Sequence, residues 1–124
     1  DAEGSAEVKM AIAKRRMKLL RGGVAKKVRE ADVIITNPTH FAIAIKYERN
    51  SMHAPVVLAK GQDFLALKMR EIAKEAKVPI VENKPLARAL YRLCEAGDFV
   101  PRDLFGPVAE VLAYVYKSAR GARR

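Results

Sequence analysis

The sequence has no tryptophan, one cysteine and only two histidines, and each scarcity excludes a class of protein. Cys94 stands alone, so the chain has no internal disulfide, which fits a reducing compartment. We expect Cys94 to be a small buried residue on a helix. No carboxylate-rich segment, glycine-rich phosphate loop or metal-ligand spacing accompanies the histidines. These absences argue against a hydrolytic enzyme using His40 or His53, and we expect no metal and no cofactor.

Long apolar runs are also missing. The longest, such as Phe41–Ile45, have the length of a β-strand and cannot cross a bilayer, and no signal peptide precedes them. At 124 residues, half of them hydrophobic, the chain has room for one compact domain. Because it begins at Asp1 rather than at Met, we expect it to be a piece of a longer protein.

Acidic side chains are outnumbered by basic ones, 14 to 24, which gives a formal net charge of +10. Such a balance suits nucleic acid, an anionic membrane surface or an acidic protein partner. A base-stacking platform would interleave aromatic residues with the basic runs, and the four tyrosines and four phenylalanines are not placed in that way. A nucleic-acid-binding module is therefore only a distant alternative.

Residues 1–30 are predicted to form a basic helical linker, separate from a domain of residues 31–124. From Glu7 to about Arg21, apolar residues recur every three or four positions and make one narrow stripe along a helix. Gly22-Gly23 ends the pattern. Because the other faces are strongly basic, we expect this helix to project from the core as a linker to a membrane anchor. Lying on lipid and docking on a partner are alternatives.

The remaining sequence predicts four strands in a small mixed sheet. Residues 32–36 and 41–47 are short, β-branched and apolar, and their four-residue connection is too short for a parallel crossover, so they should pair antiparallel. Residues 56–59 form a third strand, from which Lys60-Gly61 turns away. Residues 78–81 form a fourth strand, reached by a right-handed parallel crossover. Pro79 indicates that this strand lies at an edge of the sheet or begins there.

Three helices are predicted to flank this sheet, which makes the fold α/β. The first is capped by Asp63 and runs to about Lys77. The second runs from Pro85 to about Glu95, and the third is capped by Asp103 and closed by Gly121. The expected buried face of the first helix consists of Leu65, Met69, Ile72 and Ala76.

The connection Asn37-Pro-Thr-His40 carries unusual chemistry. Proline has no backbone N–H, so its nitrogen cannot attack the preceding Asn side chain as in ordinary deamidation. The remaining route is attack of the Asn37 side-chain nitrogen on its own main-chain carbonyl, which forms a succinimide and expels the Pro38 nitrogen. A fixed rotamer and turn would accelerate it. His40 is the candidate proton carrier, and Thr39 the candidate to position His40 or to hydrogen-bond the developing charge.

Asn-Pro-Thr-His alone is usually an ordinary turn. The support for self-cleavage comes from the surrounding sequence. Asp32-Val-Ile-Ile-Thr-Asn-Pro-Thr-His-Phe-Ala-Ile-Ala-Ile-Lys-Tyr47 resembles the self-cleaving segment of the FlhB/YscU family, the substrate-specificity switch proteins of bacterial type III export machines. Where that family often has Tyr after the histidine, this chain has Phe41. Further matching segments are Glu7-Val-Lys9, Lys14-Arg-Arg-Met17, Ala54-Pro-Val-Val-Leu-Ala-Lys-Gly61, Val78-Pro-Ile-Val-Glu-Asn83, Pro85-Leu-Ala-Arg-Ala-Leu-Tyr91 and Val108-Ala-Glu-Val-Leu-Ala-Tyr114.

The resemblance implies a membrane domain before residues 1–30 and a cytosolic domain at the cytoplasmic face of the bacterial inner membrane. It implies one cut per molecule between Asn37 and Pro38, supported by Thr39 and His40, rather than turnover of an outside substrate. The halves would stay associated.

Further implications of the resemblance concern partners and biological role. The exporter would change from rod and hook proteins to filament proteins, prompted by a hook-length control protein. Expected partners are export apparatus components and export substrates, with no nucleic acid. Residues 50–55 and 91–96 look more flagellar than injectisome-like, and the injectisome counterpart, with its needle-length control protein, is the alternative.

Overall fold

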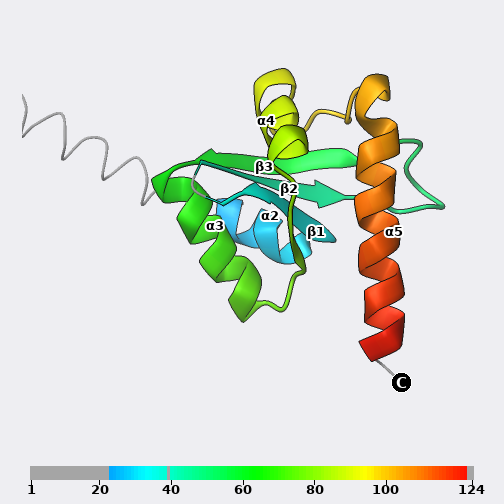
Figure 1. Cartoon of the computed structure of the whole chain (residues 1–124), viewed down its shortest axis with the longest axis horizontal. Coiled ribbons are helices and arrows are strands. Elements are labelled where there is room, and N and C mark those ends of the chain that lie inside the picture. The colour runs from blue at the N-terminus through cyan, green and yellow to red at the C-terminus, as the bar shows by residue number, and fades with distance from the viewer. Residues whose placement is uncertain (1–22, 39, 123–124) are drawn as a thin grey trace, which may run out of the picture.

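The computed structural model describes residues 23–38 and 40–122, and the predicted helix of residues 7–21 lies outside them. The described chain forms one sheet with helices on both faces (Figure 1). Its elements are α2 (Ala25–Glu30), β1 (Val33–Asn37), β2 (Phe41–Lys46), β3 (Val56–Gln62), α3 (Phe64–Glu75), β4 (Ile80–Glu82), α4 (Lys84–Leu93), the short 3-10 helix η2 (Arg102–Leu104) and α5 (Phe105–Ala122).

The sheet has four strands in the order β3-β2-β1-β4 and is mixed, as predicted. β1 and β2 pair antiparallel, from Val33 opposite Ile45 to Asn37 opposite Phe41. β2 and β3 also pair antiparallel, whereas β4 lies parallel to β1 at the sheet edge, where Pro79 was expected to place it. β3 and β4 therefore run in the same direction, and α3 connects them across the two central strands.

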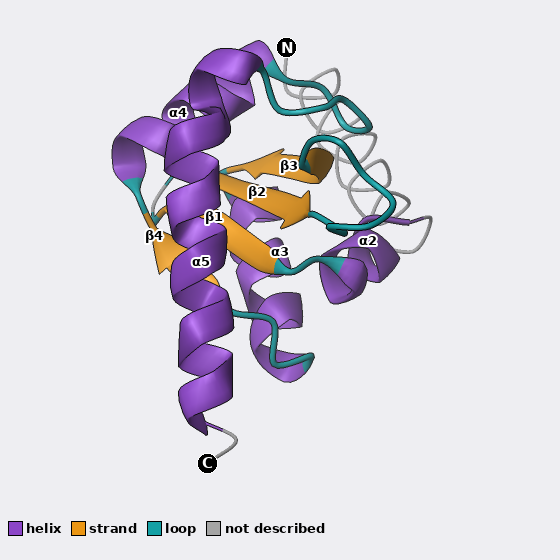
Figure 2. Ribbon diagram, turned by 90° about the vertical axis from the view of Figure 1, so that its right-hand side faces the viewer, coloured by secondary structure: helices purple, strands orange, loops and turns teal. Residues whose placement is uncertain are grey.

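Two apolar clusters cover the two faces of the sheet, because successive residues of a strand point to opposite sides. Val33 and Ile35 pack with residues of α4 and α5, while Ile34 packs with residues of α2 and α3. Figure 2 shows α5 and α3 on opposite sides of the strands. Each fully buried Ile or Val stabilises the fold by at most about 1.5–3 kcal/mol relative to an exposed one. β1 contributes to both clusters and thus connects the two halves of the core.

Helix α2 was not predicted as a separate element, yet it belongs to this packing. Val28 is fully buried in the cluster beneath α3, and Lys26 and Glu30 lie on the exposed side of the helix. No helix of residues 23–38 or 40–122 combines the length and the apolar character that crossing a membrane requires.

The third strand is longer than predicted, because Lys60-Gly61 does not turn out of the sheet. Gly61 pairs with Ala42 inside β3 and is buried under α3. A Cβ atom at this position would lie 2.7 Å from Met69 Sδ and 2.9 Å from Leu65 Cγ. The glycine therefore marks the close approach of a helix to the sheet, not a turn.

The predicted helices are present, but their burial and ends differ in detail. In α3 the buried residues are Ala66, Met69 and Ala73, so the buried face is shifted by about one residue and Ala76 is exposed. Asp63 occupies the N-cap position but makes no side-chain bond to the helix. At α4 the cap is Asn83, whose side chain accepts a hydrogen bond from the Leu86 N–H at 3.2 Å.

Two expectations about the C-terminal third have opposite outcomes. α5 continues through Gly121 to Ala122, so the glycine does not close the helix as predicted. Cys94 follows α4 and is buried at 1% exposure, as expected of a small apolar residue. Burial also raises the pKa of its thiol, which disfavours the reactive thiolate.

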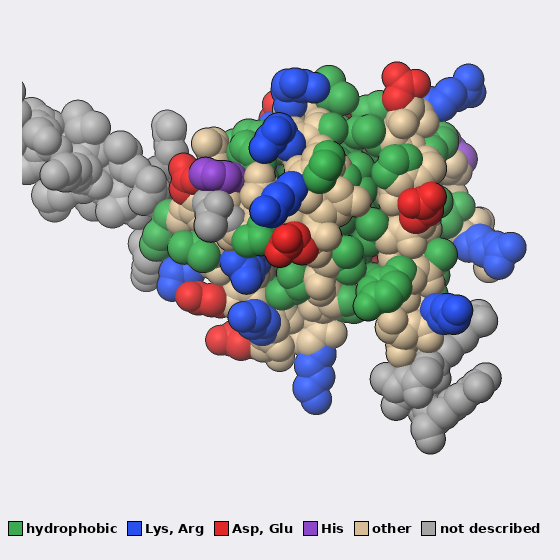
Figure 3. Space-filling model, in the orientation of Figure 1, with side chains coloured by type: hydrophobic (Ala, Val, Ile, Leu, Met, Phe, Trp, Pro, Cys, Tyr) green, Lys and Arg blue, Asp and Glu red, His purple; other side chains and the backbone are tan. Residues whose placement is uncertain are grey.

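Some of the excess basic side chains lie on the exposed side of α4. Lys84, Arg88 and Arg92 recur every four residues and are all exposed, and Figure 3 shows a row of basic side chains over this helix. None of the three forms an ion pair with another described residue. Their mutual repulsion, about 0.2–0.5 kcal/mol for each like-charged pair, is not compensated within the described fold.

Replacing the buried glycine tests the close approach of α3. Gly61→Ala should destabilise the fold by about 1–3 kcal/mol, because the new methyl group overlaps Met69 and Leu65. The matched control is Gly106→Ala in α5, where nothing lies within 4 Å of the new Cβ and alanine should stabilise the helix by up to about 1 kcal/mol. Chemical denaturation of both variants at one protein concentration measures the effects. Equal changes at the two positions would contradict this packing.

Candidate functional site

The Asn-Pro segment forms the tight end of the hairpin between β1 and β2. Asn37 is the last residue of β1 and pairs with Phe41, the first residue of β2. The His40 N–H donates to the Asn37 main-chain oxygen at 2.9 Å, which closes a four-residue turn. Pro38 stands in the second position, where its fixed φ suits a β-turn. The structure thus brings Asn37, Pro38 and His40 together, while Thr39 lies outside the described residues.

Asn37 is almost fully buried even though it borders a turn. It is 4% exposed and the preceding Thr36 is 2% exposed. The Asn83 N–H donates to the Thr36 oxygen at 2.9 Å, so the end of β1 is held from the β4 side as well as from β2. Bulk water therefore has little access to the Asn37 carbonyl carbon, and its main chain has little freedom to rotate.

The Asn37 carbonyl oxygen has a hydrogen-bond donor where negative charge would develop. Attack on a carbonyl carbon moves an electron pair to that oxygen, and a donor at about 2.7–3.1 Å stabilises it. The main-chain N–H of His40 lies at 2.9 Å in the unreacted turn. This backbone group thus holds the position that the sequence analysis considered for Thr39.

The imidazole of His40 lies on the outside of the turn. Its Nδ1 is 3.9 Å from Asp63 Oδ1, and both side chains are more than half exposed, at 61% and 65%. The Asp63 N–H donates to the His40 main-chain oxygen at 2.9 Å, so the start of α3 supports His40 through the backbone. An exposed imidazole can exchange protons with solvent and with nearby reacting groups.

Two side chains that support the turn were missed in the sequence. Arg70 of α3 donates from Nη1 to the Pro38 oxygen at 3.0 Å, and Asp63 was assigned only as a helix cap. Arg70 belongs to no motif. The sequence indicated its role only weakly, because it directly follows Met69, which was predicted to face the core. The ring of Phe41 stacks on Tyr91 of α4, with centroids 4.4 Å apart, which anchors the strand leaving the turn.

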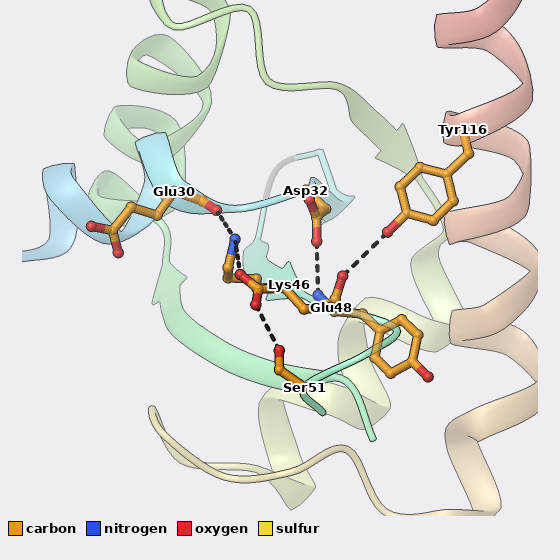
Figure 4. A network of polar contacts seen from close by, with 7 residues as sticks. Glu30, Asp32, Lys46, Glu48, Ser51 and Tyr116 are labelled. Atoms are coloured by element: carbon orange, nitrogen blue, oxygen red, sulfur yellow. Dashed lines mark hydrogen bonds and ion pairs between the residues drawn. The ribbon is translucent and has the colours of Figure 1, made fainter. Parts of the chain in front are cut away.

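The opposite end of the hairpin is tied by a separate polar network (Figure 4). The Tyr47 N–H donates to Asp32 Oδ2 at 2.7 Å, and Tyr116 of α5 donates to the Tyr47 oxygen at 3.4 Å. Glu48 accepts a hydrogen bond from Ser51 at 2.7 Å and pairs with Lys46 at 3.4 Å, and both contacts lower the pKa of the Glu48 carboxyl. These contacts fasten the open end of β1 and β2.

Residues outside the hairpin add no second reactive centre to the described part of the chain. His53 lies on the surface, as expected, with its ring 4.7 Å from that of Phe99. No group of three or more His, Cys, Asp and Glu within residues 23–38 and 40–122 is arranged to hold a metal ion.

The fold and this turn define a small α/β domain built around an Asn-Pro hairpin. The model of the family described as "FlhB HrpN YscU SpaS Family" matches residues 1–115. The chain therefore belongs to this family, and the resemblance found in its sequence is confirmed.

Individual relatives agree with this assignment. The chain is 51% identical over 117 residues to the flagellar biosynthetic protein FlhB of Bacillus subtilis, a match that covers 94% of this chain and 32% of that protein. The crystal structure of the FlhB cytoplasmic domain from Shewanella putrefaciens is similar with a TM-score of 0.77 and 42% identity, covering 81% of this chain and 77% of that one.

A third relative has a lower sequence identity. An EscU C-terminal domain with an Asn-to-Asp mutation has a TM-score of 0.73 and 32% identity, covering 75% of this chain and 99% of that one. These comparisons confirm the fold and favour the flagellar branch over the injectisome branch. The chain spans about a third of the length of the curated relatives that it matches.

Proposed function

We propose that this chain is the cytosolic switch domain of a flagellar type III export apparatus, and that it cuts itself once between Asn37 and Pro38. The observation that carries the proposal is the state of Asn37. It is buried at the end of an inner strand, precedes a proline, and has a backbone donor 2.9 Å from its carbonyl oxygen. Membership of the family supports the same function.

The proposed reaction is intramolecular and needs no outside nucleophile. The lone pair of Asn37 Nδ2 forms a bond to the Asn37 main-chain carbon, and the carbonyl electron pair moves to the oxygen beside the His40 N–H. When the intermediate collapses, the bond to Pro38 breaks and its electron pair stays on the Pro38 nitrogen. That nitrogen gains one proton while Nδ2 loses one, so no net proton is consumed.

The products are residues 1–37, ending in a succinimide, and residues 38–124, beginning with a proline amine. One water molecule then opens the ring. Because both reacting atoms belong to one residue, the fold has to contribute orientation rather than a binding pocket. The ladder on both sides of β1 and the closed turn provide that orientation.

The four residues of the turn have different parts in this reaction. Asn37 supplies the nucleophile and the carbonyl, and Pro38 supplies a leaving nitrogen without an N–H. His40 supplies a backbone donor to the carbonyl oxygen, and its exposed imidazole carries protons between the reacting nitrogens and solvent. Thr39 is assigned a supporting role through its hydroxyl or its backbone N–H.

The wider role rests on the family. We infer a longer protein with a membrane domain at the cytoplasmic face of the inner membrane. Residues 1–30 would link that membrane domain to the domain of residues 31–124. The domain would act with other components of the export apparatus and with export substrates. Cleavage would accompany the change from rod and hook proteins to filament proteins, prompted by a hook-length control protein.

The cyclic product distinguishes this mechanism from hydrolysis. A freshly formed fragment 1–37 should be one water lighter than its acid, because the ring forms before water enters. Denaturing mass spectrometry soon after synthesis should detect this species, and hydroxylamine should convert it into a hydroxamate. A fragment that carries the extra water from the first time point, with no trapped product, would show that water is the nucleophile.

Substitutions should rank the four residues of the turn. Asn37→Ala should abolish cleavage because it removes the nucleophile, and Pro38→Ala should slow it strongly because the turn loosens and an N–H returns. His40→Ala keeps the backbone donor, so its loss should stay within the roughly 10²–10⁴-fold typical of acid–base assistance. Thr39→Ala should be mildest. Fragment formation in the purified variants is followed by mass, and a Pro38 terminus from Asn37→Ala would exclude side-chain cyclisation.

The cut halves should remain together. β1 pairs with β2 at five positions and with β4 at three, and Val33, Ile34 and Ile35 are fully buried. Burial of these side chains contributes at most about 1.5–3 kcal/mol each. Native chromatography should give one species where denaturing electrophoresis gives two. Two native species would contradict retention of the strand.

A further inference from the structure

The side chain of Arg70 in α3 contacts the Asn-Pro turn. Its Nη1 donates to the Pro38 carbonyl oxygen at 3.0 Å, across 32 residues of sequence. The residue stands in the middle of α3, directly after Met69, which is fully buried against the sheet. The guanidinium therefore reaches the turn from a fixed part of the core.

The environment of this guanidinium indicates that its position is constrained. Arg70 Nε is buried and has no hydrogen-bond partner within residues 23–38 and 40–122. A long basic side chain normally keeps its charged head in water, and a buried donor without a partner destabilises the fold. Arg70 nevertheless directs its charged end at a backbone oxygen.

The bond to the Pro38 oxygen has a specific mechanical effect. The proline ring fixes φ at about −65°, so rotation about ψ is the remaining main-chain freedom of Pro38. A donor held on the carbonyl oxygen restricts that rotation. The ladder of β1 fixes the Asn37 side of the scissile bond, and Arg70 fixes the side that departs.

We propose that Arg70 is a positioning residue of the self-cleavage reaction, which holds the leaving half of the scissile bond in line with the attacking Asn37 side chain. The inference rests on the proposed function. Arg70 does not transfer a proton, because a guanidinium stays charged at every relevant pH. Its effect on the rate should therefore be independent of pH, in contrast to that of the His40 imidazole.

The test compares variants of Arg70 with a matched control. Arg70→Met keeps the apolar stem and removes the donor and the charge, whereas Arg70→Lys keeps a charged donor. The control is Lys74→Met, an exposed cation one helical turn further along α3. The full 124-residue chain is labelled with methionine by a short pulse of cell-free synthesis, and cleavage is followed during the chase. The wild-type fragments contain two methionines each, Met10 and Met17 in the first and Met52 and Met69 in the second. Arg70→Met and Lys74→Met each add one methionine to the second fragment, which is allowed for when the labelled bands are compared.

Arg70→Met should cleave about 10–100-fold more slowly than the wild type, since misplacement by about 1 Å can cost 10²-fold. Lys74→Met should cleave at the wild-type rate, and Arg70→Lys should recover part of the lost rate. Millimolar guanidinium should also partly restore Arg70→Met. When the cleavage rate is plotted against pH, the curve of Arg70→Met should be lower than that of the wild type but have the same shape. The curve of His40→Ala should have a different shape.

Folding is checked separately with Asn37→Ala, which keeps the chain in one piece. The double variant Asn37→Ala with Arg70→Met should have a melting temperature within a few degrees of that of Asn37→Ala alone. Wild-type cleavage by Arg70→Met would overturn the proposal, as would a slow rate that follows a lower melting temperature and that neither lysine nor guanidinium restores. A wild-type chain that stays intact would instead refute self-cleavage itself, before Arg70 is in question.

Discussion

The ladder around β1 is the constraint on which the rest of the structure depends. This strand is buried along its whole length, from Val33 to Asn37, with β2 on one side and β4 on the other. Val33 and Ile35 enter one apolar cluster and Ile34 the other, so α4 and α3 pack against opposite faces of the same strand. Asn37 ends this strand, so its main chain is held by the whole sheet, and this supports the proposed reaction at the turn.

In the proposed self-cleavage, the geometry at Asn37 would replace several parts of an ordinary active site. Substrate binding is unnecessary because nucleophile and electrophile share one residue, and the effective concentration depends only on the rotamer and the turn. In the proposed reaction the His40 N–H would serve as the oxyanion donor, because the hydrogen bond of this turn points at the Asn37 oxygen. Ordinary secondary structure would thus supply most of the arrangement that the proposed reaction needs, together with a proline after Asn37.

Local sequence patterns predicted those parts of the fold that depend on neighbouring residues. The β-branched runs gave the strands, the four-residue connection gave the antiparallel hairpin, and Pro79 gave the edge position. Long-range packing decided the rest: Gly61 was taken for a turn because its contact with Met69 comes from a helix placed only by the fold. Arg70 was missed for the same reason, since its partner Pro38 lies 32 residues away and the bond involves a backbone oxygen.

The two ends of the hairpin are held by independent contacts, and this limits what the proposed cut can change. At the open end, Asp32 accepts from the Tyr47 N–H and donates its own N–H to the Ile45 oxygen, at 2.7 and 2.8 Å. Neither bond uses a residue of the turn. Breaking the Asn37–Pro38 bond therefore leaves the ladder and both apolar clusters in place, and frees only the segment that Arg70 and Asp63 hold. A partner that binds the cut and the uncut chain differently must then contact this turn, because the core beneath the turn stays the same.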